Sequence, residues 1–229
     1  MSAVSALEAT GEKFSIKPFL QMRRRTRRAV MDIGARVTVG MVEEDARAMA
    51  SDLLAKMDMR KGWHQVIVRF GPNTTKDFME PSDKGVVLGS DDIFFVDIGP
   101  VHGDLEGDGG ETFVFGSDPE HHRAKADVRL IWNDVRDKWF RDGLTGRALY
   151  DYAERTAAEK GWRLNRDLSG HRLSEFPHSV HYDGTMATVD FRPSPLLWML
   201  EIAIIHPERK FGAFYEDLLL DNQSLDAPD

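Results

Sequence analysis

Two kinds of hydrophobic spacing divide the chain into helices and strands. The segment from about Pro18 to Arg36 contains no strong helix breaker and predicts a helix, and a second helix is expected to begin near Glu43. Two more helices are predicted over Pro119–Phe140 and Thr145–Glu159, the first with proline in its opening turn. Helical segments therefore occur both before and after the centre of the chain.

Alternating or continuous apolar runs between these helices predict strands. Trp63–Gly71 alternates and is rich in β-branched residues, and Asp92–Gly99 and Glu111–Phe115 follow. The runs "LLWMLEIAII" and "FGAFYEDLLL" near the C-terminus have the same character. Helices mixed with antiparallel strands predict an α+β fold. We expect one domain over residues 18–220, an N-terminal arm over 1–17 and a C-terminal tail over 221–229.

One strand contains a carboxylate where an apolar residue is expected. In "IFFVDIG" the alternation puts Phe95, Asp97 and Gly99 on one face and Phe94, Val96 and Ile98 on the other. A buried, isolated carboxylate costs several kcal/mol or becomes protonated. If the chain folds back at the following glycines, Asp108 comes beside Asp97. Two close carboxylates require a shared proton or a cation between them.

Two familiar loop motifs do not fit this stretch. As a calcium loop beginning at Asp104 it has Phe115 at the twelfth position, where a bidentate glutamate is required. It also contains no G-x-G-x-x-G motif for a dinucleotide. Because the chain has no cysteine, disulfides, thiolate zinc sites, iron–sulfur clusters and cysteine nucleophiles are excluded. Any metal must therefore bind oxygen and imidazole ligands.

Similar polar residues recur downstream. Glu201 stands inside one apolar run and Glu216 precedes another, while "SGHRLSEFPH" presents His171 and His178. Taken singly, each acid could be a paired structural residue and each histidine a structural one. Several carboxylates together with an imidazole are what two neighbouring divalent cations require, and such a ligand set suits Mn, Fe, Co or Zn.

Composition limits the setting in which the protein works. The 229 residues are 41% hydrophobic and 30% charged, which suits one large soluble domain or at most two small ones. No apolar leader or membrane-length apolar run is present, so we expect a cytoplasmic protein without a membrane partner. The net charge of −8 argues against nucleic acid as a partner. The basic cluster Arg23–Arg28 is expected to be the solvated face of the first helix.

The ordered ligand candidates resemble a known family. "FFVDIGPVHGDLEGDGGETFVFG", "SGHRLSEFPH", "MLEIAI" and "YEDLLL" are similar to the motifs of the pita-bread metallopeptidases, the family of methionine aminopeptidase, aminopeptidase P, prolidase and creatinase. "VTVGMVEEDARAMASDLLAKM" resembles a helix start in the same family. The resemblance covers about Pro18 to Leu220 and implies a curved antiparallel sheet covered by helices.

The resemblance also implies a role for each candidate. Its metal ligands would be Asp97 on one ion, Asp108 and Glu216 bridging two ions, and His171 and Glu201 on the other ion. A hydroxide held between the two ions would attack an amide carbonyl. His178 would contact the oxyanion, Glu201 would carry a proton to the leaving amine, and Thr112 would orient the carboxylates.

Departures from the family pattern concern the substrate. Phe78 stands where many members have a substrate-contacting histidine, and His64 either substitutes for that histidine or has only a structural role. Arg172 replaces a glycine of the family motif; it either offers a cation to a substrate carboxylate or forms a surface salt bridge. The large N-terminal domain of creatinase and aminopeptidase P has no counterpart, so we expect a minimal catalytic domain.

These observations predict a dinuclear metal-dependent hydrolase of an amide bond, most simply an aminopeptidase or dipeptidase of the Xaa-Pro type. Its expected partners are a short peptide or an amino-acid-derived small molecule, and a homodimer remains open. Two alternatives also remain open. One is a creatinase-like hydrolase of a small non-peptide substrate, and the other is a non-catalytic binding module, against which the intact ligand set argues.

Overall fold

A seven-stranded antiparallel sheet forms the centre of the computed structural model, which describes residues 6–59 and 61–221. Its strands are β2 (Ile67–Phe70), β3 (Asp92–Ile98), β6 (Gly109–Phe115), β7 (Arg163–Leu164), β8 (His171–Arg172), β9 (Trp198–Ile205) and β10 (Gly212–Leu218). They lie in the order β2-β3-β6-β10-β9-β7, and β8 also pairs with β9. A small sheet in the order β1-β4-β5 joins β1 (Lys61–Gly62), β4 (Pro100–His102) and β5 (Leu105–Glu106).

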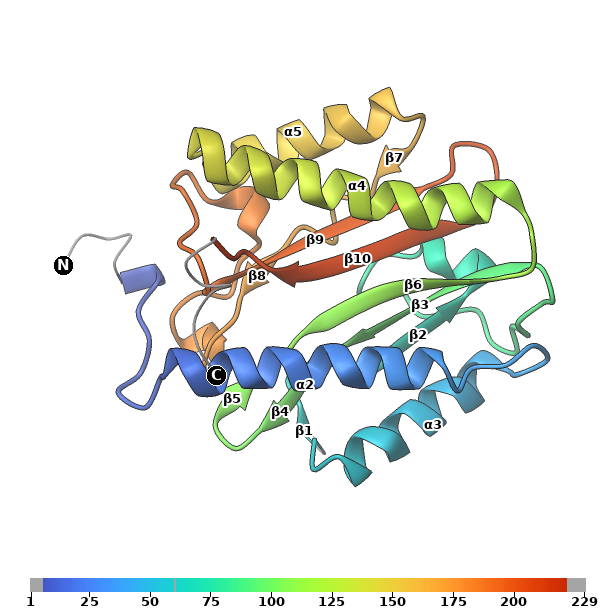
Figure 1. Ribbon diagram of the computed structural model, residues 1–229, viewed down its shortest axis with the longest axis horizontal. Helices are drawn as coiled ribbons and strands as arrows, with labels where there is room; N and C mark the ends of the chain where they lie inside the picture. Colours follow the sequence, from blue (N-terminus) through green and yellow to red (C-terminus); the bar gives the residue numbers. More distant parts are fainter. Residues whose placement is uncertain (1–5, 60, 222–229) are drawn as a thin grey trace.

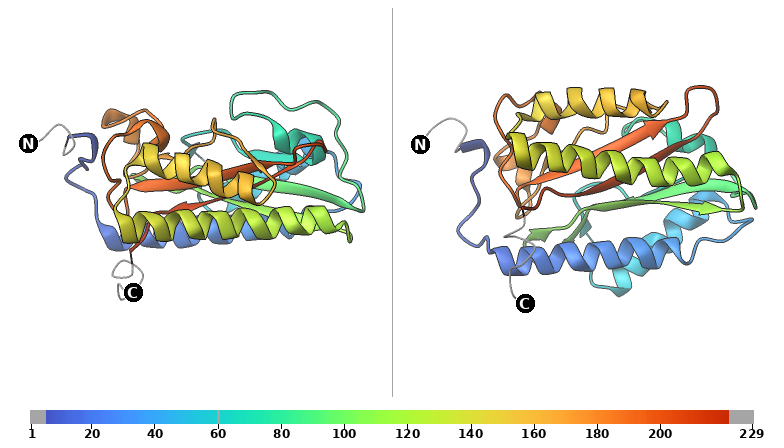
Figure 2. Two further views of the ribbon diagram at one scale, coloured as in Figure 1. Left: turned by 90° about the horizontal axis from the view of Figure 1, so that it is seen from above. Right: turned by 45° about the horizontal axis from the view of Figure 1, so that its top comes forward.

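Four helices cover this sheet in two pairs (Figure 1). They are α2 (Ile16–Gly34), α3 (Glu43–Lys56), α4 (Pro119–Asp142) and α5 (Gly146–Glu159). α2 and α3 lie along the β2-β3-β6 half, and α4 and α5 lie along the β10-β9 half. The two longest helices, α2 and α4, follow the same face of the sheet in Figure 2. Within the described residues, none of the helices has the length and apolar character needed to cross a bilayer.

The predicted helices agree closely with the structure because their ends carry clear signals. The side chain of Asp118 accepts hydrogen bonds from the backbone nitrogens of Glu120 and His121 and so caps α4, whose first residue is Pro119. The helix ends at Asp142 and is capped by Gly143, which adopts a left-handed conformation with φ of 64°. The predicted α+β class is confirmed.

The strand predicted over Trp63–Gly71 is shorter than expected. β2 contains only Ile67–Phe70, and Trp63 and His64 lie in the bend between the two sheets. Gly62 pairs with Pro100 in the small sheet, whereas Ile67 pairs with Asp97 in the large sheet. The chain therefore changes sheets at Trp63 and His64, which alternation alone does not reveal.

The two faces of β3 differ as predicted. Phe94, Val96 and Ile98 pack in the cluster that includes Ile33 of α2. On the other face, Phe95 packs against Phe214, with ring centroids 5.2 Å apart. A second large cluster surrounds Trp139, Tyr150 and Trp198 under α4 and α5. Each half of the sheet thus has its own apolar support on the helix side.

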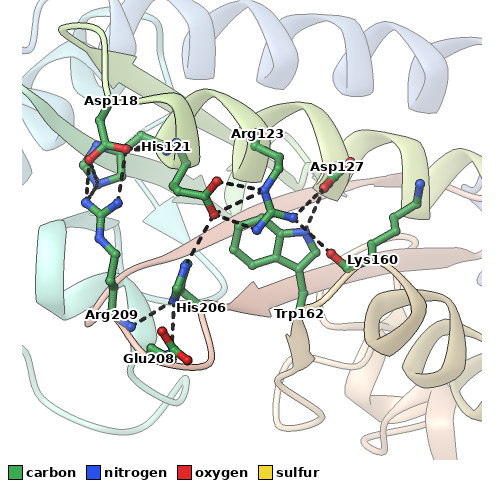
Figure 3. Close-up of polar contacts among 10 residues, drawn as sticks. Asp118, His121, Arg123, Asp127, Lys160, Trp162, His206, Glu208 and Arg209 are labelled. Carbon is green, nitrogen blue, oxygen red and sulfur yellow. Dashed lines mark hydrogen bonds and ion pairs between the residues drawn. The ribbon is translucent and has the colours of Figure 1, made fainter.

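The turn between β9 and β10 is tied to α4 by charged side chains (Figure 3). Arg209 donates to both carboxylate oxygens of Asp118, at 3.1 and 2.5 Å. Farther along α4, the guanidinium of Arg123 lies 4.0 Å from the ring centroid of Trp162. The Trp162 indole nitrogen donates to Asp127 at 2.8 Å. The Arg209 contact fixes the start of α4 against the turn between the strands that carry Glu201 and Glu216, and the Trp162 contacts fix α4 against the start of β7.

The basic cluster of α2 is not simply solvated, so that expectation was wrong. Arg23 donates to both carboxylate oxygens of Asp217, each at 2.6 Å, and Arg27 donates to one of them at 3.0 Å. Arg25 donates to the carbonyl oxygen of Met57. Asp217 is 4% exposed, and a buried carboxylate needs such partners. Part of the cluster therefore joins α2 to β10 and α3.

The first described residues contact the body of the protein. Glu8 accepts hydrogen bonds from the backbone and hydroxyl of Ser194, at 2.8 and 2.6 Å, and from the indole of Trp198 at 2.7 Å. The expected arm over residues 1–17 also overlaps α2, which begins at Ile16. Of the expected tail over 221–229, residues 222–229 lie outside the described part of the chain.

Candidate metal centre

One row of residues across four strands brings three of the candidate acids together. Asp97 of β3 lies opposite Gly110 of β6, Gly110 lies opposite Glu216 of β10, and Glu216 lies opposite Glu201 of β9. Residues paired across neighbouring strands point to the same face of a sheet. A Cβ on Gly110 would lie 2.2 Å from the Phe214 ring and 3.0 Å from Glu216 Oε1. The glycine therefore leaves room for the acids beside it.

Asp108 and His171 complete the cluster. Nε2 of His171 lies 2.8 Å from Oδ2 of Asp108 and 3.2 Å from Oε1 of Glu201. One donor atom each from Asp108, His171, Glu201 and Glu216 lies within 4.8 Å of the others. Asp97, the remaining predicted ligand, lines the same cavity of about 190 Å³. The structure thus brings together every predicted metal ligand.

Burial and close packing strongly shift the pKa values of these groups. Burial raises the pKa of the Asp97 carboxyl to about 7, and burial and neighbouring acids raise the pKa of Glu216 well above its usual value. Burial alone would raise the pKa of Asp108, but hydrogen bonds from His171 and His64 lower it to about 2. Burial likewise opposes the charged form of His171, yet Asp108 and Glu201 raise its pKa well above the usual value. The buried acids therefore depend on the imidazoles of His171 and His64 to balance part of their charge.

The donor set fits divalent cations. Oε1 of Glu216 is buried and has no hydrogen-bond partner among the described residues, although an acceptor in such a place normally has one. A cation between this oxygen and its neighbours would supply the missing partner. Four carboxylates and one imidazole suit Mn, Fe, Co or Zn. Because bound metal requires deprotonated ligands, metal uptake must release the protons held by these groups.

The comparisons with known proteins agree with this geometry. The model of metallopeptidase family M24 matches residues 19–220. The chain belongs to metallopeptidase family M24. No curated protein matches the sequence.

Solved structures show the pita-bread fold of the M24 family in this chain. The X-Pro aminopeptidase of Thermotoga maritima gives a TM-score of 0.76 at 18% identity, covering 95% of this chain and 64% of its own. A dipeptidase of Pyrococcus horikoshii gives a TM-score of 0.77 at 18% identity, and the match covers 96% of this chain and 64% of the dipeptidase. A prolidase of the same organism gives a TM-score of 0.73 at 19% identity, and the match covers 91% of this chain and 59% of the prolidase. The chain thus spans between 59% and 64% of the length of these M24 structures.

His178 lies in the M24 cavity beside the ligand cluster. Its ring stacks on His171, with centroids 5.5 Å apart, and lines the same cavity. Nδ1 lies 2.9 Å from Oε2 of Glu106, and the His178 backbone nitrogen donates to Oε1 of Glu106 at 3.0 Å. A carboxylate oxygen accepts from a ring N–H, so Nδ1 is the donor of this pair and Nε2 is the ring nitrogen that does not contact Glu106.

Sequence reasoning missed Glu106, Trp63 and Tyr150. Glu106 is 1% exposed. Trp63 lines the cavity and packs against the rings of His64, His171 and His178, at centroid distances of 4.4, 4.7 and 5.0 Å. The hydroxyl of Tyr150 donates to the carbonyl oxygen of Glu201 at 2.9 Å and accepts from its backbone nitrogen at 3.2 Å. These side chains hold the predicted M24 residues in place.

His64 and Phe78, the expected substrate contacts, both line the cavity. Their rings lie 5.7 Å apart. Nε2 of His64 lies 3.5 Å from Oδ1 of Asp97 and 3.5 Å from Oδ1 of Asp108. Burial would lower the pKa of His64, but these two carboxylates raise it to about 9. His64 therefore faces the M24 acids.

Arg172 does not have either of the roles expected from the sequence. It is fully buried and donates to the carbonyl oxygens of Leu197 and Ala9, at 2.7 and 3.0 Å. Its guanidinium is directed to the backbone of these two segments and is not among the groups that line the cavity. The predicted substrate contact and the predicted surface salt bridge were both wrong, because the sequence does not show that the N-terminal segment covers this side chain.

Thr112 acts on the backbone rather than on a carboxylate. Its hydroxyl donates to the carbonyl oxygen of Phe214 and accepts from the Phe214 nitrogen, both at 2.8 Å. Glu216 follows two residues later on β10. Thr112 thus fixes the backbone of β10, the strand that carries Glu216. We propose that it orients the Glu216 carboxylate indirectly, through this strand.

Proposed function

We propose that this chain is a metal-dependent hydrolase of amide bonds, of the X-Pro aminopeptidase or dipeptidase type, acting on short peptides. The observation that carries the proposal is the single cavity in which the acid row, His171 and His178 meet. The family membership and the fold shared with an X-Pro aminopeptidase, a dipeptidase and a prolidase support it. The small cavity of about 190 Å³ favours a short substrate.

The ligands proposed for two divalent cations are Asp97, Asp108, His171, Glu201 and Glu216. When bound, such cations polarise a carbonyl oxygen and make water a nucleophile at neutral pH. The side chains then have separate tasks. In its doubly protonated form, His178 donates from Nε2 to the oxygen that becomes negative in the transition state. Glu201 carries a proton to the leaving amine. Phe78 packs against the substrate but cannot donate a hydrogen bond to it.

The proposal is tested by assaying the protein after loading with Mn²⁺ or Co²⁺. We expect hydrolysis of X-Pro dipeptides or of longer peptides that begin X-Pro, and loss of this activity on addition of a chelator. Amino-acid amides and small amidines provide the comparison set. Turnover of a small amidine with no cleavage of any peptide would replace the peptidase proposal by a creatinase-like one. Equal activity in the chelated protein would contradict metal dependence.

Glu106 provides a prediction about the positioning of His178. Glu106→Gln keeps the size of the side chain and removes its charge. A hydrogen bond to a charged group contributes about 1.5 to 3 kcal/mol. We therefore expect kcat to fall by about tenfold or more, with little change in metal content. Glu159→Gln, at an exposed helix position, is the control and should match the parent. If Glu106→Gln has the same kcat as the parent protein, the hydrogen bond between Glu106 and His178 does not support turnover.

A further inference from the structure

His64 and His171 each direct Nε2 to one carboxylate oxygen of Asp108, and a backbone carbonyl orients each ring through Nδ1. Nδ1 of His64 lies 2.6 Å from the carbonyl oxygen of Gln65, and Nδ1 of His171 lies 2.6 Å from that of Arg172. A carbonyl oxygen only accepts, so each neutral ring carries its proton on Nδ1 and presents the lone pair of Nε2. Metal-binding histidines in proteins are usually oriented by such a bond.

The surroundings of His64 are shaped to hold its ring. A Cβ on Gly99 would lie 2.2 Å from Cδ2 and 2.4 Å from Nε2 of His64, so the ring occupies the space that the glycine leaves. The backbone nitrogen of Trp63 donates to the carbonyl oxygen of Gly99 at 2.9 Å. The Trp63 ring packs edge-on against His64. The side chain is only 6% exposed, so these neighbours hold the ring closely.

The direction of Nε2 decides what this ring does. It points to Asp97 and Asp108, and one donor atom from each of the three residues lies within 4.8 Å of the others. Histidine nitrogens and carboxylate oxygens bind Zn²⁺ at about 2.0 to 2.2 Å, so donors up to roughly 4.4 Å apart can share one ion. Both distances from His64 Nε2, 3.5 Å, are within this limit.

We propose that His64 binds, through Nε2, the cation held by Asp97, so that each half of the centre contains one imidazole. The inference rests on the proposed metal-dependent function. It assigns His64 to the metal instead of to the substrate contact that the sequence suggested. An added nitrogen ligand favours Co²⁺ or Zn²⁺ over Mn²⁺, which prefers oxygen ligands.

Metal titration tests this assignment without an activity assay. The metal-free protein is titrated with Co²⁺, followed by visible absorption and by calorimetry, and then with Mn²⁺. We expect two ions per parent chain. In His64→Ala and in the more conservative His64→Gln, one ion should bind as in the parent and the other at least tenfold more weakly, with a larger loss for Co²⁺ than for Mn²⁺. His178→Ala, from the same cavity, should keep both ions.

The possible outcomes separate this inference from the proposed function. Parental Co²⁺ affinities and spectra in both His64 variants would overturn the role of His64 and leave the dinuclear centre standing. Fewer than two ions in the parent would overturn the proposed centre, and with it this inference. Equal weakening in His178→Ala would also overturn it, because the loss would then be a general effect of opening the cavity.

Discussion

Asp108→Asn should abolish hydrolysis and remove most of the bound metal. Asp108 is the residue that belongs to both groups of possible ligands, with Oδ2 near His171 and Oδ1 near His64. An amide has no charge and presents a donor where the carboxylate has an acceptor. Metal ions supply several kcal/mol of transition-state stabilisation, so turnover should fall by roughly a thousandfold or more. Elemental analysis after dialysis, together with the peptide assay, measures both effects.

Asp167→Asn is the matched control for the metal measurement. Asp167 lines the same cavity but belongs to neither group of possible ligands among the described residues. Its variant should keep the parental metal content. An Asp108→Asn protein that retains two ions and normal turnover would show that the proposed ligand set is incorrect.

His178→Ala should separate turnover from metal binding. Loss of one donor to a developing oxyanion typically lowers kcat about a hundredfold to a thousandfold. Because the ring of His178 pairs with Glu106, and not with an acid of the metal cluster, the variant should fold, keep its full metal content and change KM far less than kcat.

The corresponding change at His171 gives the comparison. His171 Nε2 contacts Asp108 and Glu201, so His171→Ala should lose metal as well as activity. Metal stoichiometry and steady-state kinetics on both variants make the test. If His178→Ala loses a metal ion, or if it turns over like the parent, the assigned division between the two histidines fails.

Local signals explain why much of this fold could be predicted. The cap at Asp118, the proline after it and Gly143 define α4 from nearest neighbours alone. Asp97 could be singled out because strand alternation puts it opposite an apolar face. The acid row depends on register, which the sequence does not state, yet Asp97 and Glu201 stand inside apolar runs and Glu216 directly precedes one, so all three could be singled out.

The residues that support the site gave no such signal. Glu106 lies in a strand of two residues, and its partner His178 is 72 positions away. Tyr150 lies on an amphipathic helix, where a buried tyrosine is ordinary, and its hydroxyl contacts a backbone 51 positions away. Arg172 was misassigned for the same reason, since its partner Ala9 lies 163 positions away. Contacts of this range follow from topology rather than from local pattern.

The boundary between β6 and β10, here called the seam, divides the sheet between the two pairs of helices, and the proposed metal centre lies across it. Metal binding there would affect the stability of the fold as well as the chemistry. Asp97 and Asp108 lie on one side of this seam, and His171, Glu201 and Glu216 lie on the other. Across the seam, the register joins Glu216 to Gly110, and Thr112 joins the backbone at Phe214. A cation bound there would link the two halves of the protein through its ligands. By mass action, a ligand at a hundred times its Kd stabilises the native state by about 2.7 kcal/mol. The supply of free divalent ions would then govern how long the chain resists heat and proteolysis, even in the absence of substrate.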